Sequence, residues 1–410
     1  MKRKPLSLLL LLLPLLSLQA QKSNCECEKD FLFLHEKIER TPAYKINRTA
    51  YQSTRAELQN AASSAQSQYE CYLILNKLLL PLNDNHSRIY GIDPGATSEL
   101  RSRPEGLAPF KKTALYSAYP KTALDLDSLK IALSDKPATN LEGIYTRGDS
   151  LRIGLVKTHK VVEYQAIVLS EGFELWSPGE VIYSYIPYGN DYLLGVGGGI
   201  SSKRMIAYTE RIDQGTFAFM GFSKHSEQFN YGAKLPTDNL YFRQELGPEI
   251  TYLSVGSFNS WYPTLSDAEA FYASLENSLT KEHLILDLRN NGGGGERNSN
   301  LLLKILKKYA KEHNLYVLTN HRTASNAEQF THELRSWKRA TIFGQRTNGT
   351  LAYEIKDSSY ELPCGQFVAI LSSKKHAEYL PFESQGLEPD HLLDPTSDWI
   401  EQVVEYIRNH

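Results

Sequence analysis

The chain has 410 residues, a formal net charge of −2 at pH 7 and 4 cysteines. This length exceeds what a single hydrophobic core usually organises, so two or three structural units are expected. The nearly balanced charge and the lack of a basic stripe argue against a nucleic-acid-binding protein.

The first twenty residues have the pattern of a secretory signal peptide. The basic start MKRKP is followed by the apolar run LSLLLLLLPLLSL and by a small residue, Ala20. We therefore expect cleavage after Ala20 and a secreted or periplasmic protein. The apolar run is short for a membrane span and Pro14 interrupts it, so no stable membrane anchor is expected.

Residues 25–95 are predicted to form a helical unit. Apolar side chains recur at helical spacing over residues 28–40 and again over 51–80. The second helix is expected to end at Pro81, and the polar segment LNDNHSRIY follows it.

The cysteines are expected to form disulfides, because an exported protein meets an oxidising environment. Cys27 and Cys71 fall on the two predicted helices and could link them, but Cys25 competes for the same partner. Cys364 lies in a late strand-like segment and is expected to be structural. No Cys or His spacing indicates a zinc site.

Residues 96–247 are predicted to form a β-rich unit. Short runs such as EYQAIVLSE and GEVIYSYIP are rich in β-branched and aromatic residues and are separated by turn signals. This succession is typical of an antiparallel barrel or sandwich. The GVGGG run at 195–199 lacks the Lys-Ser/Thr of a phosphate-binding loop, so we interpret it as a bend.

Residues 248–410 alternate strand-like and helix-like segments, which predicts an α/β unit with a mostly parallel sheet. In such sheets, functional residues gather where strands lead into helices. The four glycines at 292–295 lie at one such transition and Ser325 at another. Ser325 and Glu328 also form a capping-box pattern, so a helix cap is the simplest interpretation of Ser325 by itself.

The glycine run and Ser325 are compatible with acyl-transfer chemistry. Backbone N–H groups of a glycine loop, and the amide of Asn326 at a helix start, can stabilise an oxyanion. A serine nucleophile also needs a base. His86 follows the polar residues Asn83, Asp84 and Asn85 directly after a long helix, although a solvated polar loop would explain it as well.

Four segments occur in an order that resembles the S41 family of serine peptidases, which includes the C-terminal processing peptidases and the tricorn protease core. They are LNDNHSRI, LILDLRNNGGGG, VLTNHRTASNAEQF with TIFGQRTNGT, and QGLEPDHLL. The resemblance covers the last part of the chain well and the β-rich middle not at all. It implies a ClpP/crotonase-like α/β catalytic core, an N-terminal helical cap that carries His86, and an inserted β-rich domain.

The resemblance also implies roles for individual residues. The family nucleophile falls on Ser325, and the oxyanion donors fall on the amides of Gly292 or Gly293 and of Asn326. The processing-peptidase branch uses a lysine as the base, but Thr350 stands at that position.

The tricorn-like branch uses a His and a Glu instead, which map to His86 and Glu383. In that branch Ser325 would attack, His86 would take its proton, and Glu383 would orient the imidazole. Asn85 stands where the tricorn pattern has a supporting Ser, and an Asn can still form hydrogen bonds.

Together, these patterns predict an exported serine endopeptidase that cleaves proteins or peptides without a metal or another cofactor. A catalytically degenerate relative that binds peptides or apolar ligands stays open, as does a partner-binding role for the β-rich unit. The oligomeric state is open as well.

Overall fold

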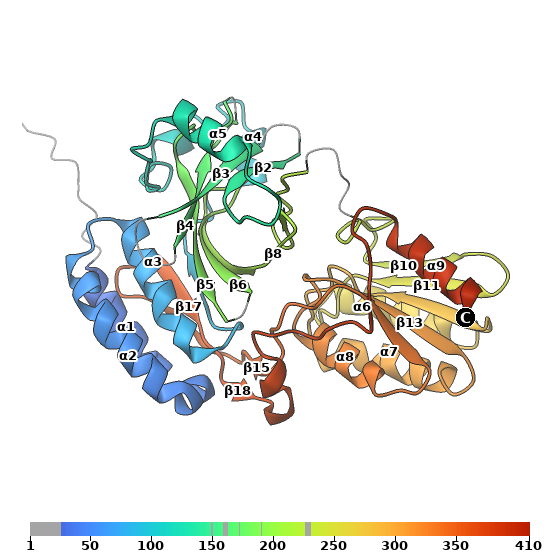
Figure 1. Cartoon of the computed structure of the whole chain (residues 1–410). Coiled ribbons are helices and arrows are strands. Elements are labelled where there is room, and N and C mark those ends of the chain that lie inside the picture. The colour runs from blue at the N-terminus through green and yellow to red at the C-terminus, as the bar shows by residue number, and fades with distance from the viewer. Residues whose placement is uncertain (1–25, 149–150, 159–162, 172, 190, 226–230) are drawn as a thin grey trace, which may run out of the picture.

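The computed structural model describes residues 26–148, 151–158, 163–171, 173–189, 191–225 and 231–410 (Figure 1). The predicted signal peptide, its cleavage site after Ala20, and Cys25 lie outside these residues. Within them, no helix combines the length and the apolar character needed to cross a membrane. Figure 1 shows two lobes: an amino-terminal lobe with α1–α5 and β1–β9, and a carboxy-terminal lobe around β10–β14.

Three helices begin the amino-terminal lobe: α1 (Cys27–Ile38), α2 (Pro42–Ser64) and α3 (Gln68–Leu79). The predicted helix over 51–80 is therefore two helices. The chain breaks between them because Ser67 caps a new helix, its side chain accepting a hydrogen bond from the amide of Glu70 at 3.1 Å. Thr41 caps α2 in the same way, accepting from the amide of Tyr44 at 3.2 Å.

The β-rich unit contains one six-stranded antiparallel sheet whose strands are ordered as in the sequence. Its strands are β2 (Gly143–Arg147), β3 (Leu151–Lys157), β4 (Tyr164–Val168), β5 (Val181–Tyr188), β6 (Tyr192–Gly198) and β7 (Met205–Glu210). In the described residues β2 and β7 do not pair, so hydrogen bonds do not close the sheet into the barrel that was one of the two predicted forms. Helix α5 (Leu126–Ser134) packs on this sheet through Leu129 and Leu133.

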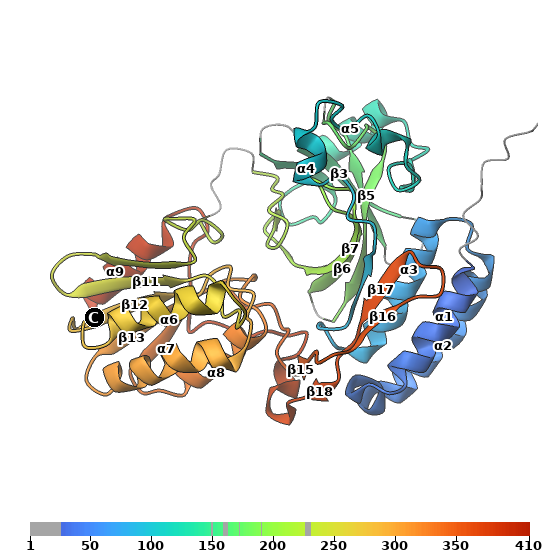
Figure 2. The ribbon, with the colours of Figure 1, turned by 180° about the vertical axis from the view of Figure 1, so that it is seen from behind.

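A hairpin from the last part of the chain lies in the amino-terminal lobe. Strand β17 (Phe367–Ile370) pairs antiparallel with β1 (Arg88–Gly91) and with β16 (Ser359–Glu361). Figure 2 shows this hairpin beside α3, where the ring of Phe367 stacks on Tyr72 with centroids 5.2 Å apart. The segment QFVAIL was predicted as a strand of the α/β unit, and its placement there was wrong.

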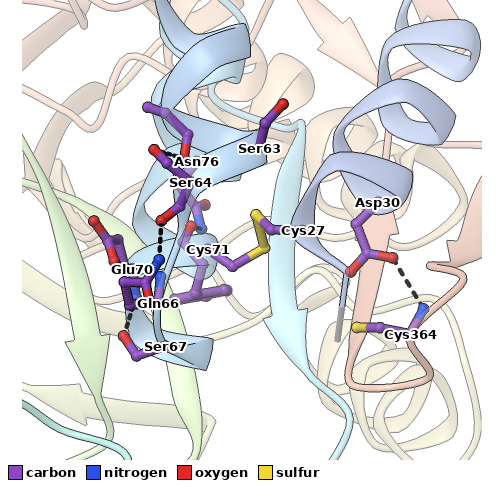
Figure 3. The surroundings of a disulfide bond; sticks show 12 residues. Cys27, Asp30, Ser63, Ser64, Gln66, Ser67, Glu70, Cys71, Asn76 and Cys364 are labelled. Atoms are coloured by element: carbon purple, nitrogen blue, oxygen red, sulfur yellow. Dashed lines mark hydrogen bonds between the residues drawn. A yellow bond between two sulfur atoms is a disulfide. The ribbon is translucent and has the colours of Figure 1, made fainter. Parts of the chain in front are cut away.

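A disulfide bond joins two of the helices (Figure 3). Cys27 on α1 is bonded to Cys71 on α3, which resolves the pairing that the sequence left open. The sequence separation of 44 residues corresponds to a loop-closure stabilisation of about 4 kcal/mol. Cys364, in the turn between β16 and β17, is disulfide-bonded too, and its amide donates to Asp30 of α1 at 2.9 Å.

The carboxy-terminal lobe is built on a six-stranded sheet in the order β10-β11-β12-β13-β14-β19. Its strands are β10 (Tyr241–Glu245), β11 (Ile250–Val255), β12 (His283–Asp287), β13 (Asn314–Thr319), β14 (Ala340–Gly344) and β19 (His391–Leu392). All pairs except β10–β11 are parallel, which confirms the mostly parallel sheet predicted for this unit.

Helices cover both faces of this sheet. Consecutive residues of its strands are buried, and they point to opposite faces, so both faces must be covered. On β12, Leu284 and Leu286 pack with α6 (Thr264–Leu275), α7 (Glu296–Tyr309) and α8 (Asn326–Arg335). Ile285, between them, packs on the other face with α9 (Trp399–Asn409).

The expected unit boundaries at residues 95 and 247 do not coincide with boundaries between hydrophobic cores. The three helices and the six-stranded antiparallel sheet share one continuous core. Strand β10, placed in the β-rich unit by the sequence, belongs to the carboxy-terminal sheet. The three helices and the antiparallel sheet therefore pack as one body, which the hairpin β16–β17 joins from the last part of the chain.

Candidate active site

Ser325 occupies the turn between β13 and α8, in a backbone conformation that non-glycine residues rarely adopt. Its φ is 56° and its ψ is −127°. The surrounding chain holds this conformation: the amide of Ala324 donates to the carbonyl of Asn291 at 3.0 Å, and the amide of Ser325 donates to Glu328 at 3.0 Å. The predicted capping box is present. A side chain on such a strained turn is held at a fixed position at the helix start.

Glu328 is a fully buried residue whose carboxylate hydrogen-bonds to the segments around Ser325. Besides the amide of Ser325, it accepts hydrogen bonds from the hydroxyl of Thr347 at 2.5 Å and from the amides of Gly349 and Thr350 at 2.7 and 2.8 Å. Burial raises the pKa of Glu328 to about 7. Thr350, which replaces the family lysine, therefore contributes to a structural network.

His86 lies across from Ser325, on the short loop between α3 and β1. Its Nε2 atom is 2.9 Å from the Ser325 Oγ atom, although 239 residues separate the two in the sequence. Asp84 shapes the loop by accepting the amide of His86 at 3.0 Å, the hydroxyl of Ser87 at 2.6 Å and the hydroxyl of Ser372 at 2.9 Å. His86 of the amino-terminal lobe thus lies within hydrogen-bond distance of Ser325 in the carboxy-terminal lobe.

Burial lowers the pKa of His86 to about 3, with a further contribution from the positive charge of Arg88. The imidazole is therefore neutral near pH 7. A neutral imidazole can accept a proton from a hydroxyl group, which a charged one cannot do.

Asn85 connects the His86 loop to three other segments. Its amide donates to Glu383 at 2.8 Å, and its side-chain Nδ2 donates to the carbonyl of Gly349 at 2.8 Å. Its side-chain oxygen accepts a hydrogen bond from the hydroxyl of Tyr188, at the end of β5, also at 2.8 Å. The β-rich unit therefore touches the residue next to His86.

Glu383 lies near His86 but does not hydrogen-bond to it in the described part of the chain. Its carboxylate accepts the amides of Asn85, Leu351 and Ala352 at 2.8, 2.9 and 2.7 Å. The Nδ1 atom of His86 is buried without a hydrogen-bond partner in this region. The expected direct bond from Glu383 to the imidazole is thus absent among the described residues, and the carboxylate accepts three backbone amides instead.

Asp84, His86 and Glu383 are nevertheless neighbours, with one polar atom of each within 4.8 Å of the others. Burial and, to a smaller extent, the negative charge of Asp84 raise the pKa of Glu383 to about 8, although the three amides that it accepts lower it. Both carboxylates already accept several hydrogen bonds from the protein, and these bonds fix the loop around His86.

The glycine run lies directly against Ser325. Gly293 has a φ of 92°, and a Cβ atom there would come within 2.8 Å of the Ser325 Cβ atom, so a side chain is excluded. The amide of Gly293 donates to Asn291 at 2.9 Å, and Gly292 does not line the pocket beside Ser325. The amide of Gly293 is therefore engaged with Asn291, and the oxyanion role of Gly292 stays a prediction.

Two backbone amides are available to the pocket. Gly294 and Asn326 both line it, and within the described residues neither backbone amide donates a hydrogen bond. Asn326 was among the predicted oxyanion donors and Gly294 was not, since four consecutive glycines give no signal for which of them lies beside the serine.

The pocket has a volume of about 380 Å³ and is open to solvent. Residues of β15 (Tyr353–Glu354) and of β18 (Lys374–Lys375) also line it. There Glu354 accepts a hydrogen bond from Lys374 at 2.9 Å and lies 3.2 Å from the Nε2 atom of His376. These charged residues were not singled out in the sequence, since exposed polar residues on two-residue strands carry no recognisable pattern.

Residues 296–393 match the family model described as peptidase family S41. The matched segment contains Ser325 and Glu383, whereas His86 and the glycine run precede it.

Three solved structures are similar over most of the chain. The photosystem II D1 C-terminal processing protease is 16% identical over 90% of this chain and 93% of its own, with a TM-score of 0.37. Mature CPAF is 12% identical over 94% and 98%, with a TM-score of 0.43. The tricorn protease is 14% identical over 93% of this chain and 37% of its own, with a TM-score of 0.39.

Because these TM-scores are low, the family assignment rests on the family model and on the motifs within the matched segment. The match confirms the resemblance that the motifs indicated: residues 296–393 are similar to peptidase family S41.

Proposed function

We propose that this protein is an exported serine endopeptidase in which Ser325 is the nucleophile and His86 the general base. The observation that carries the proposal is the 2.9 Å separation of His86 Nε2 and Ser325 Oγ, two atoms brought together from different lobes. The pKa of His86, lowered to about 3 mainly by burial, keeps the imidazole neutral but makes it a weak base, so the proposed proton transfer requires a nearby negative charge such as an ionised Glu383.

In the proposed reaction, His86 Nε2 takes the hydroxyl proton while Ser325 Oγ forms a bond to the substrate carbonyl carbon. The carbonyl oxygen becomes negatively charged and is stabilised by the free amides of Gly294 and Asn326, at the positive end of α8. Collapse of this intermediate breaks the C–N bond, and His86 gives its proton to the departing amine. Water, activated by the same imidazole, then hydrolyses the acyl-enzyme and restores Ser325.

Glu383 contributes in two ways under this proposal. Its hydrogen bond with the amide of Asn85 holds the loop that carries His86. When the imidazole becomes positively charged, an ionised Glu383 within a few ångströms lowers the energy of that state. The imidazolium in turn favours ionisation of Glu383, whose pKa is raised to about 8 in the resting protein.

The proposed substrates are flexible segments of proteins or peptides, since the pocket is open on one side. Secretion or export to the periplasm is proposed from the signal-peptide pattern of residues 1–20. A second candidate is a binding protein without peptidase activity. The unpartnered Nδ1 atom of His86 favours it, because a base whose ring is not oriented by an acceptor is a poorer base.

Hydrolysis of an unfolded protein such as casein, and of fluorogenic peptides, separates the two candidates. The purified wild type is expected to release peptides, and Ser325→Ala and His86→Ala are expected to lose that activity. Ser336→Ala is the matched control, since Ser336 is an exposed serine just beyond the end of the same helix α8. Binding of the peptides without turnover by the wild type would favour the binding protein instead.

A further inference from the structure

Two neighbouring aromatic side chains are strongly exposed on the loop that contacts the glycine run through Phe258 and Ser260. Trp261 is 79% and Tyr262 is 86% exposed, which makes them the most exposed large hydrophobic residues in the described part of the chain. Exposed aromatic groups of this size are uncommon on protein surfaces unless they contact another molecule. Tryptophan and tyrosine are also the side chains that most often dominate binding energies.

The backbone below the two rings is firmly held. The amide of Trp261 donates to the side chain of Asn259 at 3.1 Å, and its carbonyl accepts the amide of Leu265 at 3.0 Å. Asn298 of α7 donates to the carbonyl of Asn259 at 2.9 Å. The exposure of the rings is therefore not the result of a loose loop, and little backbone entropy would be lost when they bind a ligand.

The same loop packs against the glycine run. Phe258 forms a parallel bridge with Gly294, and the hydroxyl of Ser260 donates to the carbonyl of Gly295 at 3.1 Å. A Cβ atom on Gly294 would come within 2.1 Å of the backbone of Phe258, so the two segments touch along their main chains. Gly294 and Gly295 line the pocket of Ser325, and Trp261 follows Ser260 directly.

We propose that Trp261 and Tyr262 form a subsite that binds a large apolar or aromatic side chain of the polypeptide substrate near the bond to be cleaved. The subsite rests on the proposed peptidase function. Its continuity with the glycine wall of the pocket favours a substrate segment as the occupant over a separate partner protein. Glu354, Lys374 and His376 also line the pocket and offer polar groups to a substrate, whereas Trp261 and Tyr262 offer exposed apolar surface.

The test compares two fluorogenic peptides that differ at one position beside the cleavage site, Phe in one and Ser in the other. The wild type is expected to show a higher kcat/KM for the Phe peptide, and Trp261→Ala with Tyr262→Ala is expected to reduce that preference about tenfold or more. Ile131→Ala is the matched control, because Ile131 is 75% exposed but lies on α5 in the other lobe. An unchanged preference in an active double variant would overturn the subsite.

A second measurement does not depend on cleavage. In Ser325→Ala protein, the Phe peptide is expected to change the tryptophan fluorescence more than the Ser peptide does, and Trp261→Phe is expected to abolish the change. Trp176 and Trp399 are buried and should not respond, and the half-buried Trp337, beyond the end of α8, is replaced by Phe in every protein that is compared. Equal responses to both peptides would overturn the subsite, as would a dimer of the free protein that dissociates in the Trp261→Ala variant. A wild type that shows the fluorescence change but no hydrolysis would reject the peptidase function and retain the binding site.

Discussion

Replacement of Tyr188 by Phe tests whether the β-rich unit positions the catalytic base. The Tyr188 hydroxyl, at the end of β5, donates to the side-chain oxygen of Asn85 at 2.8 Å. Asn85 precedes His86, and its own amide donates to Glu383. The substitution therefore removes a single hydrogen-bond donor from the segment that holds His86 against Ser325.

The size of the effect follows from the burial of Asn85, which is 8% exposed. A buried acceptor left without its donor costs about 1–3 kcal/mol. If that cost is relieved by a shift of the His86 loop, the barrier for proton transfer rises by a similar amount, which corresponds to a fall in kcat of about 5- to 100-fold. KM should change little, because Tyr188 does not line the pocket of Ser325.

The assay is kcat and KM for a fluorogenic peptide, with thermal unfolding measured in parallel. Tyr185→Phe is the matched control, because its hydroxyl makes a buried 2.6 Å hydrogen bond to Tyr208 within the same sheet and does not contact the His86 loop. Both variants should lose stability, but only Tyr188→Phe should lose kcat. Equal kcat values for the two variants would refute the positioning role of the β-rich unit.

Two further predictions concern Ser325 and Glu328. Ser325→Gly should be about 1 kcal/mol more stable than Ser325→Ala in urea unfolding, since a φ of 56° with a ψ of −127° suits glycine; equal stabilities would mean that the turn is not strained. Burial raises the pKa of Glu328 from 4.5 to about 7, so the folded protein retains a proton that the unfolded chain loses above pH 4.5. The contribution of Glu328 to the free energy of unfolding is fully present below pH 4.5. It falls by about 1.4 kcal/mol per pH unit as the pH rises toward 7. Urea unfolding between about pH 5 and 7 should therefore show a shallower decline in Glu328→Gln than in the wild type, and equal slopes would show that Glu328 is ionised when folded.

The sequence predicted the carboxy-terminal sheet well because its strands are buried on both faces and alternate with amphipathic helices. It failed for the segment 367–370, since a short apolar run reveals that it is buried but not which strand it pairs with. The predicted boundary near residue 247 was wrong for a related reason. Strand β10 is an edge strand of mixed polarity, and it pairs with β11 of the carboxy-terminal sheet.

The sequence predicted those residues of the candidate site that belong to family motifs. It did not predict the contacts that backbone groups make. The family motifs led to Ser325 and His86, which lie within hydrogen-bond distance. The partners of Glu383 are backbone amides, which have no sequence signature. Tyr188 also went unnoticed, because a tyrosine at the end of a β-strand is most often part of a core.

Labelling with a fluorophosphonate probe, followed by mapping of the modified peptide, tests the central claim most directly. Such probes react with serines activated by a neighbouring base. We expect the wild type to be modified on Ser325 and His86→Ala to be modified far more slowly. Modification of a different residue, or a His86→Ala variant that reacts as fast as the wild type, would contradict the assignment of Ser325 and His86 as nucleophile and base.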